Sequence, residues 1–135
     1  FAAERGVDVK LILPGIPDKK IPYALAKTYY GTLLKAGVEI YEYTPGFVHS
    51  KVFVSDDIRG VVGTINMDYR SLCLHFENAC LFIVGQIIKD VRNDCLDTCK
   101  ISKEITVRHI KKSRRSSGLL HSIYYATLRL FAPLL

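Results

Sequence analysis

The sequence predicts an α/β fold in which a mixed β-sheet is flanked by helices. Two patterns lead to this prediction: short alternating or apolar runs typical of strands, and longer segments with an apolar residue every three to four positions, typical of helices. The two kinds of segment are interleaved along the chain, as in a layered sheet-and-helix domain. With 135 residues, 49% of them hydrophobic and 24% charged, the chain is long and apolar enough to form a globular core.

The first predicted strand covers residues 7–13, and a loop rich in Pro, Gly and Lys follows it. Residues 21–36 are predicted to form a helix, because Leu25 and Leu33 belong to an apolar set with helical spacing. Gly37 comes next, where a glycine commonly ends a helix.

Four further strands are predicted at residues 38–43, 49–55, 61–65 and 77–84. Residues 56–60, read "DDIRG", are predicted to form the turn between the second and third of these. After Gly85, apolar positions from Ile87 to Cys99 follow one face of a second helix. We therefore divide the chain into a domain over residues 1–105 and a different C-terminal segment over residues 106–135.

The C-terminal segment joins a basic run to an amphipathic stretch. Five Lys or Arg residues lie between Arg108 and Arg115, and residues 119–135 follow. These 17 residues, with an arginine among them, are short for a membrane span. Two interpretations remain open: a helix lying on an anionic membrane surface, or a helix packing on its own domain or on another part of the protein.

Charge and cysteine content narrow the function classes. A net charge of +6 indicates polyanionic partners such as nucleic acid, anionic lipid or phosphate-bearing substrates. The cysteines at 73, 80, 95 and 99 lack the paired spacing of a zinc site, so we predict that they are reduced and buried in a cytosolic protein. The only methionine is Met67, and we expect the chain to be a piece of a longer protein.

The stretch from His49 to Asn66 carries the candidate chemistry. His49 and Lys51 are two residues apart on a predicted strand, so they share a face. An imidazole can act as nucleophile or acid/base, and an ammonium can neutralise a phosphate oxygen. Thr64 and Asn66 add a hydroxyl and an amide donor, and Gly63 lets the backbone approach a bound group. The pattern predicts a phosphodiester site that needs neither metal nor cofactor.

The pattern H-x-K-x4-D-x6-G-[ST]-x-N resembles the HKD motif of the phospholipase D superfamily. A chance match to its six specified positions is on the order of one in 10^5. The flanking stretches "ILPGIPDKK", "AGVEIYEYTPGFVHSK", "NMDYRS" and "FEN" are similar to bacterial cardiolipin synthases, so the resemblance extends from Gly6 to about Ile105. Thr64 stands where serine is more usual, and His75 where asparagine is common.

This resemblance implies a reaction through a covalent phosphohistidine, with two HKD motifs facing each other across one site. It implies that Lys51 and Asn66 bind the non-bridging phosphate oxygens and that Glu77 accepts a hydrogen bond from His49. Asp56 is expected to be structural, because it opens a turn too far along the strand to share the pocket. The chain has one H-x-K that continues as the full motif, since His109-Ile110-Lys111 lacks the later Asp and Gly-Thr-x-Asn. It would therefore be the C-terminal half of a two-motif enzyme, with His49 as the acid/base partner.

The implied substrate is phosphatidylglycerol, and the implied location is the cytosolic side of the bacterial cytoplasmic membrane. Two alternatives remain: a phosphodiesterase or nuclease acting as a homodimer, and a non-catalytic module that binds anionic lipid. The few aromatic residues around the motif do not favour nucleic acid as the partner.

Overall fold

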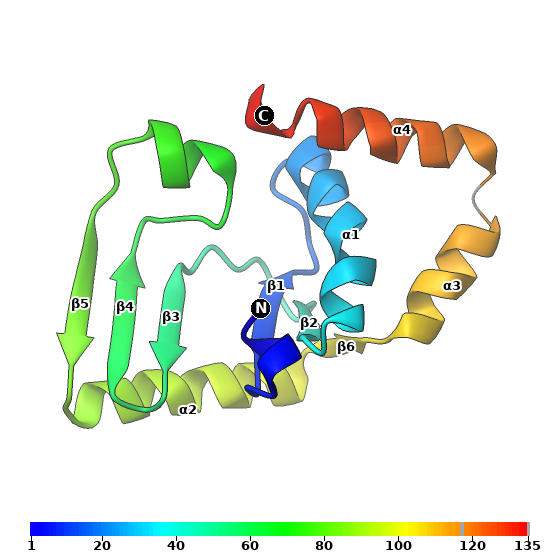
Figure 1. The fold of residues 1–135 in the computed structure, drawn as a ribbon. Coiled ribbons are helices and arrows are strands. Elements are labelled where there is room, and N and C mark those ends of the chain that lie inside the picture. Colours follow the sequence, from blue (N-terminus) through cyan, green and yellow to red (C-terminus); the bar gives the residue numbers. More distant parts are fainter. Residues whose placement is uncertain (117, 135) are drawn as a thin grey trace.

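The computed structural model describes residues 1–116 and 118–134, apart from the side chains of residues 112–116, 119–121 and 134. Its architecture is α/β, as predicted (Figure 1). The described strands form two three-stranded sheets where one mixed sheet was expected.

The first sheet is mixed and has the order β1-β2-β6. Strand β1 (Lys10–Pro14) runs parallel to β2 (Glu39–Tyr43), and β6 (Lys103–Ile105) pairs with β2 in the antiparallel direction. The parallel pair needs a crossover, which helix α1 (Lys20–Lys35) provides. Strand β6 and the connection to it were not predicted, because three residues are too short for a periodic pattern.

The second sheet is an antiparallel meander of β3 (Val52–Ser55), β4 (Arg59–Gly63) and β5 (Ala79–Ile83). Helix α2 (Gln86–Ile101) runs across both sheets and joins them into one body, as Figure 1 shows. Ile88 of α2 is fully buried beside Gly60 at the centre of β4. Cys99 is also buried and Val91 and Cys95 are half-buried, so these predicted apolar positions lie against the sheets, whereas Ile87 is exposed.

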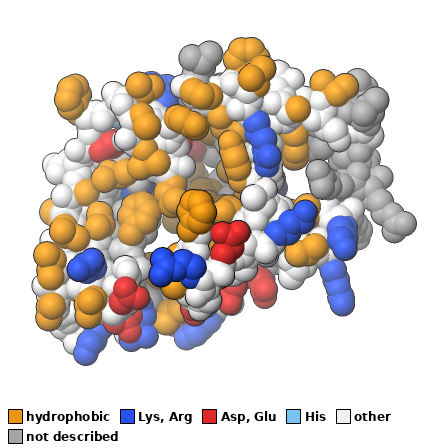
Figure 2. All heavy atoms as spheres, in the orientation of Figure 1, with side chains coloured by type: hydrophobic (Ala, Val, Ile, Leu, Met, Phe, Trp, Pro, Cys, Tyr) orange, Lys and Arg blue, Asp and Glu red, His pale blue; other side chains and the backbone are white. Residues whose placement is uncertain are grey.

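The opposite face of the meander remains open. Phe53 of β3 and the residues Leu81 and Ile83 of β5 share this face and are exposed. Figure 2 shows hydrophobic side chains gathered over this side of the molecule. The second sheet is thus covered by a described helix on one face only.

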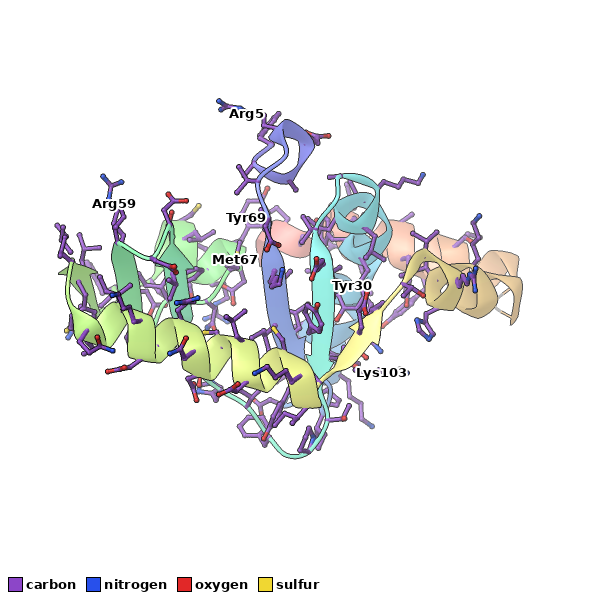
Figure 3. All side chains as sticks on the ribbon, turned by 90° about the horizontal axis from the view of Figure 1, so that it is seen from below. Arg5, Tyr30, Arg59, Met67, Tyr69 and Lys103 are labelled. Atoms are coloured by element: carbon purple, nitrogen blue, oxygen red, sulfur yellow. The ribbon has the colours of Figure 1, made fainter. Side chains whose placement is uncertain are left out.

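The core of the first sheet lies between α1 and β2. Tyr30, Ile40 and Ile105 are buried together, and Leu33 packs against them. Tyr30 comes from α1 (Figure 3), and its hydroxyl donates to Oε1 of the buried Glu42 over 3.1 Å. Burial, followed by the charge of Glu42, raises the pKa of Tyr30. The buried carboxylate is therefore satisfied by a hydroxyl that stays protonated.

The predicted end of α1 is confirmed. Gly37 has a φ of +93°, a conformation that favours glycine. Its N–H donates to the Leu34 carbonyl (3.2 Å), and the Val38 N–H donates to the Leu33 carbonyl (3.0 Å). This pair of bonds is the Schellman motif, which satisfies carbonyl groups at the helix end.

All four cysteines are free. Cys99 is buried and Cys95 is half-buried, and burial raises the pKa of both thiols. Cys73 and Cys80 are exposed, so the expectation of burial was wrong for these two. They lie on the turn η2 (Arg70–Leu74) and on the outer strand β5, which other described elements leave open.

The C-terminal segment forms α3 (Val107–Ser116), α4 (Leu119–Leu130) and the short η3 (Ala132–Leu134). Helix α4 crosses α1 and contacts it (Figure 1): the Arg129 guanidinium donates to the Thr28 hydroxyl (3.0 Å) and stacks over the Tyr29 ring (4.6 Å). Leu128 and Ala132 are buried at this end of the chain. The side chains of Lys112, Arg114 and Arg115 in the basic run lie outside the described set. Within the part that the structure describes, no helix combines the length and apolarity needed to cross a bilayer.

Candidate active site

The candidate site lies where β3 begins and β4 ends. The hydrogen-bonded strand starts at Val52, three residues later than predicted. Pairing nevertheless reaches Lys51, whose carbonyl accepts a hydrogen bond from the Gly63 N–H over 3.1 Å. His49 lies just outside this ladder, in the segment that leads from β2 to β3.

His49 is exposed, and its ring stacks on that of Phe47, with centroids 5.9 Å apart and planes inclined by 19°. Its backbone carbonyl accepts a hydrogen bond from the Lys51 ammonium over 2.6 Å. The two residues are therefore in direct contact, through the main chain of one and the side chain of the other.

Lys51 is half-buried and faces acidic groups. Desolvation lowers the pKa of its ammonium, and the nearby carboxylates of Glu77, Asp18 and Asp68 act in the opposite direction. Carboxylates from three other parts of the chain therefore act on the charge of Lys51. A partly desolvated ammonium attracts a phosphate oxygen more strongly than one in bulk water does.

Glu77 is joined to Thr64 across the β4–β5 pair. The Thr64 hydroxyl donates to Glu77 Oε2 over 2.5 Å. The Thr64 N–H donates to the Asn78 carbonyl (2.9 Å), and the Asn78 N–H donates to the Thr64 hydroxyl (3.0 Å). Hydrogen bonds from Thr64 and then Ser71, with a smaller effect of His75, hold the pKa of Glu77 below its usual value. The carboxylate is therefore charged at neutral pH.

Asn66 is held by Ser71, a residue that the motif analysis missed. Asn66 Nδ2 donates to the Ser71 hydroxyl over 3.3 Å, and the Ser71 N–H donates to Asp68 Oδ1 over 2.8 Å. Ser71 is buried and also donates to Glu77. The stretch "NMDYRS" could have predicted the position of Ser71, because its Asp68 stands three residues earlier and Asp side chains often accept a hydrogen bond from a backbone N–H in a turn.

Glu77 pairs with His75, whereas the resemblance implied a bond to His49. The distance from His75 Nδ1 to Glu77 Oε1 is 3.7 Å, and the Glu77 side chain is 15% exposed. Arg70 donates to the other ring nitrogen of His75 from Nε (3.3 Å) and Nη2 (3.1 Å). Among the contacts of the described residues, no bond joins Glu77 to His49.

Gly63 is required by the close approach of β5. A Cβ at this position would lie 2.6 Å from Cα and Cβ of Ala79, and closer still to the carbonyl oxygen of Asn78. The expected reason for this glycine was the approach of a bound group. The structure assigns the space beside Gly63 to a neighbouring backbone.

Asp56 lies at the other end of the hairpin. Asp56 and Asp57 have φ values of +54° and +57°, and the Ile58 N–H donates to the Ser55 carbonyl over 3.2 Å. These are the features of a type I′ turn, in which Asp is tolerated. Five residues of about 3.3 Å each place Asp56 up to roughly 16 Å along the chain from Lys51. Asp56 therefore lies at the opposite end of β3 from Lys51.

The fold has a counterpart among solved structures. A crystal structure of a phospholipase D family member, Nuc from Salmonella typhimurium, superposes with a TM-score of 0.65 over 78% of this chain and 68% of that one. Its identity of 19% makes this a likeness of fold.

Sequence comparison specifies the family. Residues 1–97 match the model described as "Cardiolipin synthase, PLD-like domain", and the chain belongs to this family. It is 54% identical to an uncharacterized protein of Streptococcus mutans, over 100% of this chain and 28% of that protein. It is 42% identical to cardiolipin synthase 2 of Bacillus cereus, over 99% of this chain and 25% of that protein. The chain therefore spans about a quarter of the length of these curated relatives.

Proposed function

We propose that the chain supplies one half of the active site of a cardiolipin synthase-type phosphatidyltransferase. The proposal is carried by one observation: in a chain of this family, Lys51, Thr64, Asn66 and Glu77 converge through hydrogen bonds and charge at the end of one β-hairpin. The second histidine would come from a second HKD motif in the same protein.

The proposed reaction joins two phosphatidylglycerol molecules. One histidine attacks the phosphorus of the donor, a P–N bond forms, and the P–O bond to glycerol breaks. The other histidine gives its proton to the departing glycerol oxygen. A hydroxyl of the acceptor then attacks the phosphorus, passes its proton to that second histidine, and releases the first as the P–N bond breaks. The products are cardiolipin and glycerol, and we assign the acid/base role to His49.

The remaining residues act on charge and orientation. Lys51 and Asn66 bind the non-bridging oxygens, where negative charge builds up in the transition state. Glu77 accepts bonds from Thr64 and Ser71, and its charge opposes the desolvation that lowers the pKa of Lys51. This carboxylate would thereby maintain the cation that the reaction needs.

The decisive experiment replaces His49 with alanine in the complete two-motif protein and measures cardiolipin formation in phosphatidylglycerol vesicles. We expect synthesis to be abolished with the fold intact. His109→Ala is the matched control, since His109 is also exposed but lies on α3, bonded to Thr106. Lys51→Ala should lower the rate on the order of 10²-fold or more. Wild-type rates in the His49 variant would remove it from the mechanism.

A homodimeric phosphodiesterase or nuclease is the second candidate, because the chain holds a single complete HKD motif and carries a charge of +6. Under our proposal the isolated 135-residue chain is essentially inactive on both lipid and nucleic acid. Turnover by a chain shown to be monomeric would contradict the half-site, and turnover by a dimer would favour the alternative.

The proposed partner is an anionic membrane surface on the cytosolic side. Flotation of the chain with anionic vesicles, with and without residues 108–135, would test whether it binds such a surface.

A further inference from the structure

We propose that Arg70 binds the unreacting phosphodiester of the acceptor phospholipid and thereby selects a phospholipid over water or free glycerol as acceptor. This inference rests on the proposed function and extends it to acceptor specificity. The starting observation is that Arg70 is tied to the site through its backbone while its side chain remains exposed.

The backbone around Arg70 is anchored to the site. Arg70 opens the turn η2, and the next residue, Ser71, is buried and bonded to both Asn66 and Asp68. The Arg70 carbonyl accepts a hydrogen bond from the His75 N–H over 2.8 Å, which closes the turn. The Arg70 backbone is therefore held in place next to Ser71, which is hydrogen-bonded to Asn66 and Asp68.

The guanidinium itself is held by a weak partner. Its Nε and Nη2 lie 3.3 and 3.1 Å from Nε2 of His75, and the Nδ1 atom of that ring is 3.7 Å from Glu77. Among the described residues no carboxylate pairs with Arg70, whereas Arg92 pairs with Asp57 at 3.2 Å. A phosphate offers charged, bidentate acceptors that match the guanidinium better than an imidazole does. The charge of Arg70 is thus available to an anion.

The product explains why a second anion site is needed. In cardiolipin two phosphodiesters are linked by one glycerol, so an acceptor phosphatidylglycerol brings its own negative charge close to the reacting phosphorus. Lys51 faces the first phosphate in our proposal, and repulsion between the two anions calls for a second cation. Arg70 is the described arginine closest in sequence to the Asn66–Ser71 network. Water and glycerol carry no phosphate, so neither needs the positive charge of Arg70 to act as acceptor.

The test compares two acceptors in the complete two-motif enzyme. Arg70→Gln should lower cardiolipin formation on the order of 10- to 100-fold, the value of a charge-assisted hydrogen bond, and should raise the KM for acceptor phosphatidylglycerol. Exchange of labelled glycerol into phosphatidylglycerol should stay within about twofold of wild type, because that acceptor has no phosphate. Arg70→Lys, which keeps the charge, should recover part of the cardiolipin activity.

Arg59→Gln is the matched control. Arg59 is also exposed, but Figure 3 shows it at the outer end of the hairpin sheet, apart from Met67 and Tyr69 in the segment that leads to Arg70. It should change neither reaction. Equal losses of both reactions in Arg70→Gln, or a variant that matches Arg59→Gln in both, would overturn the acceptor role. A wild-type enzyme that performs neither reaction would overturn the proposed function itself.

Discussion

Replacing Gly63 with alanine is expected to separate β4 from β5 and to disturb the site attached to them. The added Cβ would lie 2.6 Å from two atoms of Ala79, whereas ordinary contact begins at 3.4 Å. Because the neighbours are backbone and Cβ atoms, the strands must move apart by about 1 Å. Overpacking of this kind costs about 1–3 kcal/mol, and the weakened bond from the Thr64 N–H to Asn78 adds about 1 kcal/mol. We expect the free energy of unfolding to fall by about 2–4 kcal/mol.

Urea denaturation of the 135-residue chain measures this change through the midpoint and the slope. Gly60→Ala is the control on the same strand, because its Cβ would meet Ile88 at an ordinary 3.7 Å. This control should change stability by no more than about 1 kcal/mol in either direction. If Gly63→Ala proved as stable as Gly60→Ala, the packing argument for Gly63 would fail.

Three further perturbations test the polar contacts. Thr64→Val should raise the pKa of Glu77 toward its usual 4.5, because it removes the Thr64 hydrogen bond, which lowers that pKa the most. NMR titration of the Glu77 carboxyl group measures the change. The Thr64–Glu77 bond stabilises the fold above pH 4.5, and this stabilisation is lost as the pH falls through the lower pKa of Glu77 in the folded protein. Thr64→Val should therefore lose less stability on acidification than the wild type does. Identical Glu77 titrations in the variant and the wild type would contradict this. Glu77→Gln should lower the pKa of Lys51 further, as seen in lysine NMR, and an unchanged value would show that the two do not interact. Tyr30→Phe should cost about 1–3 kcal/mol in urea unfolding by leaving the buried Glu42 with one donor fewer, and a neutral effect would contradict the importance of that bond.

Local patterns in the sequence predicted most of the elements correctly. The apolar spacing of α1 and the glycine after it are local signals, and both the helix and its Schellman end are confirmed. The helix α2 is also confirmed, and it contacts both sheets with Ile88 and Cys99 buried, although Ile87 of the predicted apolar set is exposed. Strand β3 began later than predicted because a ladder needs a partner, and the partner strand ends opposite Lys51.

The motif identified the family and the candidate side chains, but it did not specify their partners. Glu77 meets Thr64 because β4 and β5 pair in a register that places Gly63 opposite Ala79. That register sets strands 16 residues apart in sequence side by side, and no spacing rule encodes it. Ser71 and Arg70 enter the site through the turn that follows Asn66, whose single π-helical turn has no periodic signal.

The sequence by itself determined the class of fold, the positions of the main helices and strands, and the phospholipase D-like family of cardiolipin synthases. Those features depend on residue type and on spacing along the chain. The tertiary structure alone decided that the strands form two sheets, that β5 backbone lies beside Gly63, and that Glu77 pairs with His75. These depend on strand register and side-chain packing between distant segments, which local spacing does not specify.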